Sequence, residues 1–373
     1  PICKNHIRSV YFYEMKGRDM KKFSIILGAF ILILTAAPTI SWAGEKTTDI
    51  KNTTWQDICS DVVGHYPLSV EQTSDYPAQK GKLNQPKNWE FGLGVQYFLM
   101  SHTSYQFANS GPSFQNPLSK LQFPLNTWWL ESELRRTCPR WSIGVRAGVS
   151  VAKNVDGRFK DSDWLNPANG SMLTTYSESA MRSENSYLIR ADADVNISDW
   201  LGLPPSFEIR PLFAFEFQRL NLMAHDGVQW EVGSYDVDGS GIRDDYVSVQ
   251  ALPGNTIHFR QDYYMYQIGV RGVYDGFNIG KYIKIKVKGE ADWGPVIGYN
   301  EDNHLLRDLL GYIRSSGNSL YFSTGLEMVF AKTITAGISM DYQYIRTTGI
   351  LHDRDLGHGG VEAWNDESVK VWS

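Results

Sequence analysis

The strongest constraint on this chain is an alternation of side chains that repeats in segment after segment. From Trp89 to Leu99, apolar residues occupy every second position, and Glu90, Gly92, Gly94 and Gln96 lie between them. Because successive side chains of an extended strand point to opposite faces, this pattern predicts a strand with one apolar face. Eight further runs have the same period and begin near residues 121, 142, 187, 208, 264, 283, 320 and 334. Glu367 to Ser373 begins a tenth.

The connections between the runs alternate between short and long. Arg136 to Arg140 and Leu203 to Pro205 are brief, whereas Ala152 to Ser186 and Ala224 to His258 are long and polar. The polar face of each run carries charges that the core of a soluble sandwich could not bury without pairing them. Short turns on one side and long loops on the other are typical of an outer-membrane barrel. We therefore predict an all-β fold, a ten-stranded antiparallel transmembrane β-barrel, with a soluble antiparallel sandwich as the alternative.

An antiparallel barrel of this class needs an even number of strands to bring its ends together. Nine complete runs and the start of another therefore predict that the tenth strand is truncated in this sequence. An unclosed edge would leave backbone groups unpaired in lipid, which is costly.

The segment before the runs predicts export. Lys21 and Lys22 precede an apolar run from Phe23 to Leu34, and the small residues of Ser41-Trp42-Ala43 follow. These are the three parts of a signal peptide, and the apolar run is too short for a membrane-spanning helix. The predicted organisation is upstream sequence at 1–19, signal peptide at 20–43, a periplasmic tether at 44–87 and the barrel at 88–373.

After such cleavage, two cysteines remain, Cys59 and Cys138. An even count in an exported, oxidising context allows one disulfide, which would fasten the tether to a periplasmic turn. Asp236 to Gly241 resembles part of a calcium loop but lacks the terminal bidentate glutamate, and no cysteine and histidine spacing suits zinc. The net charge of -5, without a basic stripe, argues against nucleic acid as a partner. No metal and no cofactor are predicted.

Two pairs of ionisable residues have a spacing of two. Asp302 and His304 end the seventh run, and Asp161 and Asp163 lie in the long stretch after the third. In an extended chain this spacing places both members of a pair on one face. A carboxylate beside an imidazole fixes the tautomer of the ring, which can then accept a proton near neutral pH. Two close carboxylates cannot both ionise easily, so a raised pKa is expected for the other pair.

Both pairs are predicted to lie at the outer mouth of the barrel. Asp302 and His304 have even residue numbers, like the lumen-facing Asp292 on the same run. They therefore point inward if no bulge occurs near Pro295. The face to which Asp161 and Asp163 point stays open. In the lumen, we expect a structural network of salt bridges formed by Arg190, Arg210, Arg271, Lys286 and Asp292.

With these motifs in order, the chain resembles the omptin family of outer-membrane proteases from about Phe91 to Arg346. Asp161-Ser162-Asp163-Trp164 matches the family's Asp-x-Asp-Trp catalytic segment, and Asp302-Asn303-His304 matches its Asp-x-His segment. The resemblance implies a ten-stranded barrel whose rim carries an endopeptidase site for polypeptide substrates. It also implies a place in the outer membrane of a Gram-negative bacterium, with the site facing outside and membrane lipid as a partner.

The resemblance also suggests three ligand-binding positions. The family has an acidic residue two positions before the catalytic aspartate, for a basic substrate side chain, and Asn300 stands there. The acidic partner from the first loop corresponds to His102. Both are expected to bind substrate without a strong requirement for arginine or lysine. Arg219 matches the lipopolysaccharide-binding cluster of the family, which makes lipopolysaccharide the candidate activator.

The favoured function is an endopeptidase in which His304, oriented by Asp302, takes a proton from a water held by Asp161 and Asp163. The alternative is a non-catalytic barrel, an adhesin or binding protein on the same scaffold, because a fold does not determine an activity. Retention of all four motif residues favours the enzyme.

Overall fold

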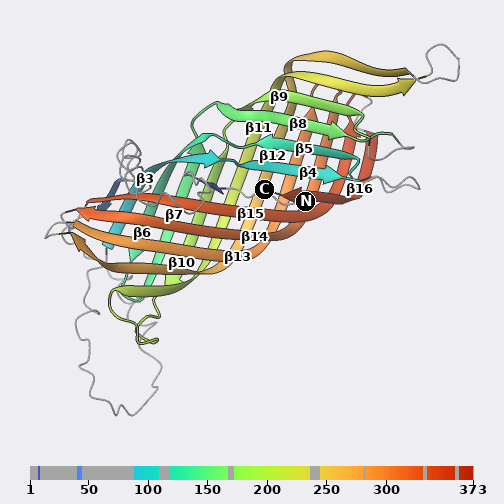
Figure 1. The fold of residues 1–373 in the computed structure, drawn as a ribbon. Coiled ribbons are helices and arrows are strands. Elements are labelled where there is room, and N and C mark those ends of the chain that lie inside the picture. Colours follow the sequence, from blue (N-terminus) through green and yellow to red (C-terminus); the bar gives the residue numbers. More distant parts are fainter. Residues whose placement is uncertain are drawn as a thin grey trace, which may run out of the picture.

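The computed structural model describes residues 7–8, 40–43, 88–108, 117–166, 172–235, 244–279, 283–330, 334–357 and 361–372. These residues form one antiparallel sheet that closes into a barrel (Figure 1). Within those ranges, no helix is both long and apolar enough to cross a bilayer.

Ten strand paths make up the wall of the barrel, and four of them are broken into an inner and an outer strand. The broken paths are β3 (Asn88–Leu99) with β4 (His102–Phe107), β6 (Trp128–Thr137) with β5 (Ser119–Pro124), β7 (Trp141–Ser150) with β8 (Asn154–Asp163), and β10 (Tyr187–Val195) with β9 (Thr175–Ser183). The other paths are β11 (Phe207–Tyr235), β12 (Asp244–Ile279), β13 (Ile283–His304), β14 (Leu309–Phe330), β15 (Ile334–Asp355) and β16 (Val361–Trp372).

The sheet closes at two levels. In the outer half, β4, β5, β8 and β9 join the strands from β11 to β16 in a ring. In the inner half, β3, β6, β7 and β10 join those from β11 to β15, and the short strands β1 (Ile7–Arg8) and β2 (Ile40–Ala43) pair with both β15 and β3. The predicted ten-stranded antiparallel barrel is confirmed.

The boundaries proposed before residue 88 stay predictions. β1 and β2 come from the segments assigned to upstream sequence and signal peptide, and the rest of 1–87, with Cys59, lies outside the described residues. Cys138 is buried in the turn between β6 and β7, and its disulfide with Cys59 also stays a prediction. The same holds for the truncated tenth strand. The segment from Asp236 to Gly241 lies outside the described residues as well.

The outward face of the inner half is apolar, as the alternation predicts. Large apolar side chains that are exposed there come from neighbouring strands around the barrel, among them Val95, Leu134, Val145, Ile189, Phe213, Ile268, Leu326 and Ile338. Such a belt suits contact with lipid tails.

The structure corrects the extent of the outer strands. The sequence predicts long polar loops at 152–186 and 224–258, and this is wrong: the first range contains β8 and β9, and the second continues β11 and β12 as one hairpin. In Figure 1 the yellow end of this hairpin reaches beyond the neighbouring strands. Beyond the membrane, neither face of a strand contacts lipid, so neither face has to be apolar. Strands there continue without the alternation by which a sequence reveals them.

The interior of the barrel has two zones. The outer zone is a cluster of buried apolar side chains that includes Phe98, Tyr105, Phe123, Trp129 and Phe259. Phe123 and Phe259 stack with their ring centroids 4.0 Å apart, and Tyr105 stacks on both. This packing ties strands from opposite walls together beneath the outer mouth.

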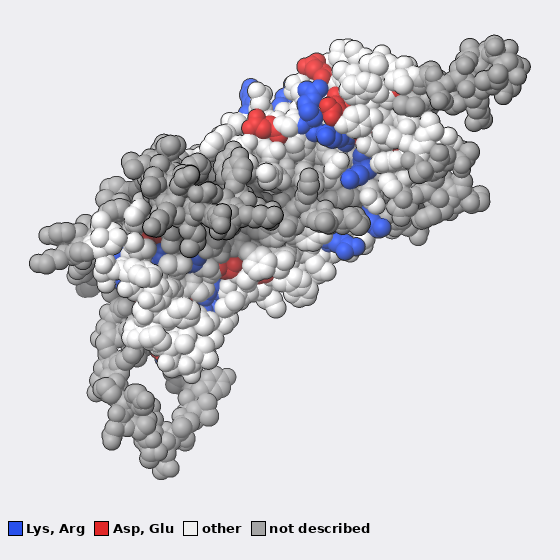
Figure 2. All heavy atoms as spheres, in the orientation of Figure 1, with Lys and Arg blue, Asp and Glu red and all other residues white. Residues whose placement is uncertain are grey.

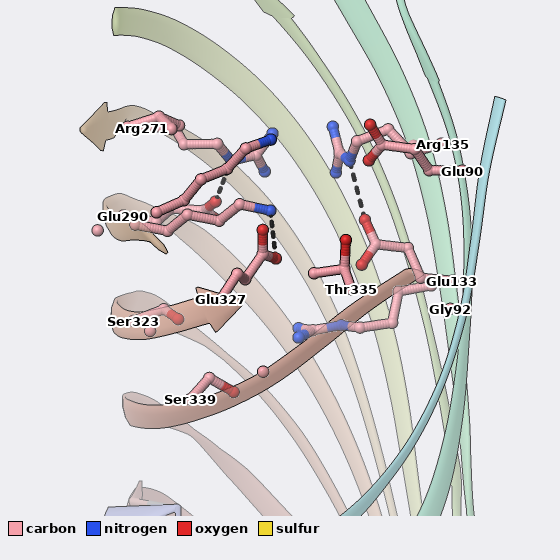
Figure 3. A pocket seen from close by; sticks show the side chains of 18 of the residues that line it. Glu90, Gly92, Glu133, Arg135, Arg271, Glu290, Ser323, Glu327, Thr335 and Ser339 are labelled. Atoms are coloured by element: carbon pink, nitrogen blue, oxygen red, sulfur yellow. Dashed lines mark hydrogen bonds and ion pairs between the residues drawn. The ribbon is translucent and has the colours of Figure 1, made fainter. Parts of the chain in front are cut away.

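The inner zone is a cavity of about 1220 Å³ lined by charged side chains (Figure 3). Arg190 reaches Glu290 and Asp292 at 2.7 and 2.5 Å, and Arg271 reaches Glu290 at 2.6 Å. Arg210 pairs with an aspartate at 2.8 Å. The predicted salt-bridge network is therefore confirmed for Arg190, Arg210, Arg271 and Asp292, while Lys286 lines the cavity.

Candidate active site

The outer end of β13 positions Asp302 and His304. β13 pairs with β14 without a register shift from Ile283 to His304, so no bulge occurs at Pro295 in this ladder. Asp302 therefore faces the interior like Asp292, as predicted, and the two are 3% and 2% exposed. His304 Nε2 lies 2.9 Å from Asp302 Oδ2.

The catalytic pair lies outside the lipid belt. On the outward face of β13, next to Asp302, Glu301 forms an ion pair with Arg260 of β12 at 2.7 Å. A charged pair that faces outward at this level indicates water or headgroups rather than lipid tails.

Tyr105 of β4 is a site residue that the sequence does not reveal, because it lies in a stretch without alternation. Its hydroxyl donates to Asp302 Oδ2, the oxygen that also meets His304. Its ring is 1% exposed and is held by the stack on Phe123 and Phe259. Burial, together with the Asp302 carboxylate, raises the pKa of Tyr105 well above its usual value. The hydroxyl consequently stays protonated and orients the carboxylate.

The partners of His304 define its tautomer. Arg307 Nη2 can only donate, so Nδ1, at 2.5 Å, accepts from it and Nε2 carries the ring proton toward Asp302. Burial disfavours the charged ring, but the charge and hydrogen bond of Asp302 outweigh burial and raise the pKa of His304. Arg307, in the turn between β13 and β14, has an opposing effect and is a second residue that sequence reasoning missed.

β8 carries the aspartate pair to the same mouth. Asp161 and Asp163 pair in register with Leu121 and Ser119 of β5. Leu121 pairs in turn with Tyr105 of β4, whose hydroxyl reaches the carboxylate on β13. The hairpin of β4 and β5 thus connects the two predicted pairs.

Charges from the other pair act on Asp161. Burial and then the neighbouring Asp163 raise the pKa of Asp161 to about 7, while His304 and Arg307 oppose the rise. Burial also raises the pKa of Asp163, against the opposing effects of a hydrogen bond from a serine and the same two cations. The raised pKa expected for this pair is confirmed.

Each pair has one carboxylate oxygen available. Asp161 Oδ1 and Asp302 Oδ1 are buried, and neither accepts a hydrogen bond within the described part of the chain. Because a buried acceptor without a donor is costly, such oxygens suit a water or a substrate N–H group.

The two predicted substrate-binding residues differ in position. Asn300 faces the interior two residues before Asp302, is 3% exposed, and has no hydrogen-bond partner for either amide atom among the described residues. His102 begins β4 and lies on the face opposite to Thr103 and Tyr105. Burial and then Lys120 lower the pKa of His102. Asn300 therefore shares the inward face with Asp302, whereas His102 does not share a face with Tyr105, and the binding roles of both stay predictions.

Arg219 lies on β11, away from the mouth. Its Nε and Nη2 atoms each lie 2.6 Å from an oxygen of Asp262, and its guanidinium lies over the rings of Tyr187 and Phe217. This ion pair neutralises much of its charge, and its lipid-binding role stays a prediction. On the visible face of the molecule, other basic side chains gather around β8 and β9 (Figure 2).

The sequence matches the model of the Omptin family over residues 115–356, a range that contains Asp161, Asp163, Asp302 and His304. No curated protein matches it significantly. Among solved structures, the fold is similar to the crystal structure of outer membrane protease OmpT from Escherichia coli, with a TM-score of 0.59 and 15% sequence identity. The match covers 77% of this chain and 92% of that chain, and at such an identity the likeness concerns the fold.

Proposed function

This chain belongs to the omptin family, and from this premise we propose that it is an outer-membrane endopeptidase of a Gram-negative bacterium. Its active site faces outside and consists of Asp161, Asp163, Asp302 and His304. The observation that supports this function most is that Asp161 and Asp302, the latter held by Tyr105 and His304, each have a buried carboxylate oxygen without a partner among the described residues.

In the proposed reaction, a water is held between the available oxygens of Asp161 and Asp302. His304 Nδ1 takes a proton from this water as the oxygen attacks the carbonyl carbon of a peptide bond. The Nε2–H group donates to the carboxylate of Asp302, and this carboxylate stabilises the imidazolium. The imidazolium then protonates the departing amine. Arg307 contacts Nδ1 and is exposed, so its guanidinium turns away when the water and the substrate bind.

The substrates are polypeptides, without a strong requirement for arginine or lysine before the scissile bond. A pocket for a desolvated cation needs a carboxylate to pair it. Asn300 offers a neutral amide, and His102 has a lowered pKa that keeps its ring uncharged near neutral pH. Lipopolysaccharide remains the candidate activator, and membrane lipid a partner.

Digestion of a mixed peptide library by the refolded barrel, with and without lipopolysaccharide, tests this function. We expect His304→Ala, and Asp161→Ala combined with Asp163→Ala, to lower the cleavage rate at least about 10²-fold, the scale of a lost general base. The rate should rise as the pH passes up through the pKa of His304, because the base must be neutral. The matched control is His225→Ala, because this ring forms an ion pair with the exposed Asp226 on β11.

Heat-modifiable migration on a gel would show that each variant still forms a barrel. Site variants that cleave as fast as the parent, or a parent that cleaves no peptide under either condition, would favour the alternative of an adhesin or binding protein.

A further inference from the structure

A third carboxylate lies beside the catalytic pair on a strand that the mechanism does not use. Asp302 of β13 pairs in register with Gly311 of β14, and Gly311 pairs with Asp353 of β15. Asp302 and Asp353 are therefore on one face of the sheet, separated by a single residue without a side chain. Asp353 is half-buried, although its neighbours His352 and Arg354 are exposed.

Gly311 leaves room for this carboxylate. A Cβ atom at Gly311 would lie 2.6 Å from Asp353 Oδ1 and 3.5 Å from the backbone oxygen of Asp302. The Asp353 carboxylate thus occupies the space above the glycine and leans toward the catalytic pair. Its contact with an added Cβ would involve the movable end of a side chain, so an alanine at this position would displace the carboxylate without breaking the sheet.

The charge of His304 is one of the influences on the pKa of Asp353. Burial and then Asp302 raise the pKa of Asp353 to about 6, while His304, Arg307 and His352 oppose the rise. The pKa of His304 is raised above its ordinary value of 6.5. The charge of the His304 ring favours the ionised carboxylate of Asp353, and by the same interaction the carboxylate favours the protonated ring.

The charged and titratable groups near His304 and its partner Asp302 come from four strands and a turn: Asp302 itself on β13, Asp161 and Asp163 on β8, Tyr105 on β4, Asp353 on β15, and Arg307 between β13 and β14. Among them, Asp161 and Asp302 belong to the proposed reaction directly. Asp353 does not contact the ring and has no part in holding the water.

We propose that Asp353 is a positioning residue for the catalytic base: its carboxylate, held above Gly311, favours the protonated ring of His304 and sets the pH at which the base becomes available. The inference rests on the proposed function, and it adds a residue outside both catalytic pairs. It also assigns a role to Gly311, whose missing side chain allows the two carboxylates to approach.

The test measures the titration of the His304 ring directly, by NMR of the refolded barrel in detergent micelles, with the signal assigned through a His304→Gln variant. We expect Asp353→Asn to lower the midpoint by ~0.5–1 pH units, the effect of removing one partly screened charge. Gly311→Ala should lower it in the same direction, and Asp353→Glu should keep it near the parent value. The low-pH limb of kcat/KM should move with the NMR midpoint.

Glu301→Gln is the matched control. It removes the same charge from the residue next to Asp302, but on the outward face, where Arg260 pairs with the carboxylate. A midpoint that stays the same in Asp353→Asn, or that moves equally in Glu301→Gln, would overturn the inference. The NMR measurement needs no turnover, so a folded barrel without peptidase activity would refute the proposed function while this titration still decides the role of Asp353.

Discussion

Two hydrogen bonds meet on one oxygen of the Asp302 carboxylate, one from Tyr105 and one with His304. A carboxylate held from two sides keeps its orientation, and the imidazole ring keeps its orientation with it. The aromatic stack beneath fixes the donor, because Tyr105 packs against Phe123 and Phe259. At the scale of residues, the catalytic geometry therefore depends on core packing.

Tyr105→Phe tests this dependence. The substitution keeps the stack and removes the donor, so we expect kcat to fall ~10–100-fold with little change in KM, the cost of one hydrogen bond to a charged group. Steady-state kinetics on a fixed peptide would measure both constants. Tyr105→Ala also opens a cavity and should lower the free energy of unfolding by about 3–5 kcal/mol. Parent-like kcat in the phenylalanine variant would contradict the orienting role.

Asn300→Asp tests the specificity. The added carboxylate would lie two residues before Asp302, in the interior near the site. We expect it to pair with a cationic substrate side chain and to raise cleavage next to arginine or lysine about a hundredfold over the parent, the value of a charge partner in a desolvated pocket. Mass spectrometry of the peptide-library products reads the preference. A parent that already cleaves mainly between paired basic residues would refute the prediction.

At the scale of elements, the unbroken register of β13 carries the catalytic pair from the membrane to the mouth. Gly294 is the point where this strand and β12 approach most tightly, because a Cβ atom there would lie 1.8 Å from the backbone oxygen of Tyr266. The carbonyl belongs to the neighbouring strand and cannot move aside without disturbing the ladder.

Gly294→Ala should therefore impair barrel assembly, at a cost of at least about 1–3 kcal/mol from overpacking. The fraction of refolded protein with heat-modifiable migration measures it. Gly289→Ala on the same strand is the control, because the nearest atom to its added Cβ would be the Ser323 oxygen at 3.9 Å, which is ordinary contact. Equal refolding yields for the two variants would contradict this account of the strand contact.

At the scale of the whole molecule, the interior ion network joins strands that are not neighbours in the sheet. Arg271 of β12 reaches Asp192 and Asp194 of β10 at 2.5 and 2.7 Å, and Glu290 of β13 at 2.6 Å. Its removal would leave three carboxylates in the interior with one cation fewer.

Arg271→Met should consequently lower the free energy of unfolding by about 3–5 kcal/mol, the cost of breaking a buried pair. Denaturant titration in micelles, followed by tryptophan fluorescence, measures the change. Arg354→Met, which removes an exposed guanidinium over the Tyr312 ring, should change it by less than about 1 kcal/mol. An equally small effect of Arg271→Met would show that the network does not stabilise the barrel.

The sequence by itself was sufficient for the strand count and for the inward direction of Asp302 on β13. The reason is that alternation and spacing are local properties, and the lipid around the inner half imposes them on every strand. The same reasoning failed at 152–186 and 224–258, where strands continue beyond the lipid and neither face must be apolar.

Only the tertiary structure decided which residues surround His304. Tyr105 lies 197 positions from Asp302 in the chain, and no local pattern relates them. Asp353 and Arg307 likewise carry no motif: Arg307 lies in the turn next to His304, and the pairing of β14 with β15 brings Asp353 beside Asp302. Closure of the ring adds β4 and β8 at the same mouth. The proton affinities of groups in such a site depend on burial and on the distances between charges. Both are determined only when the barrel has closed.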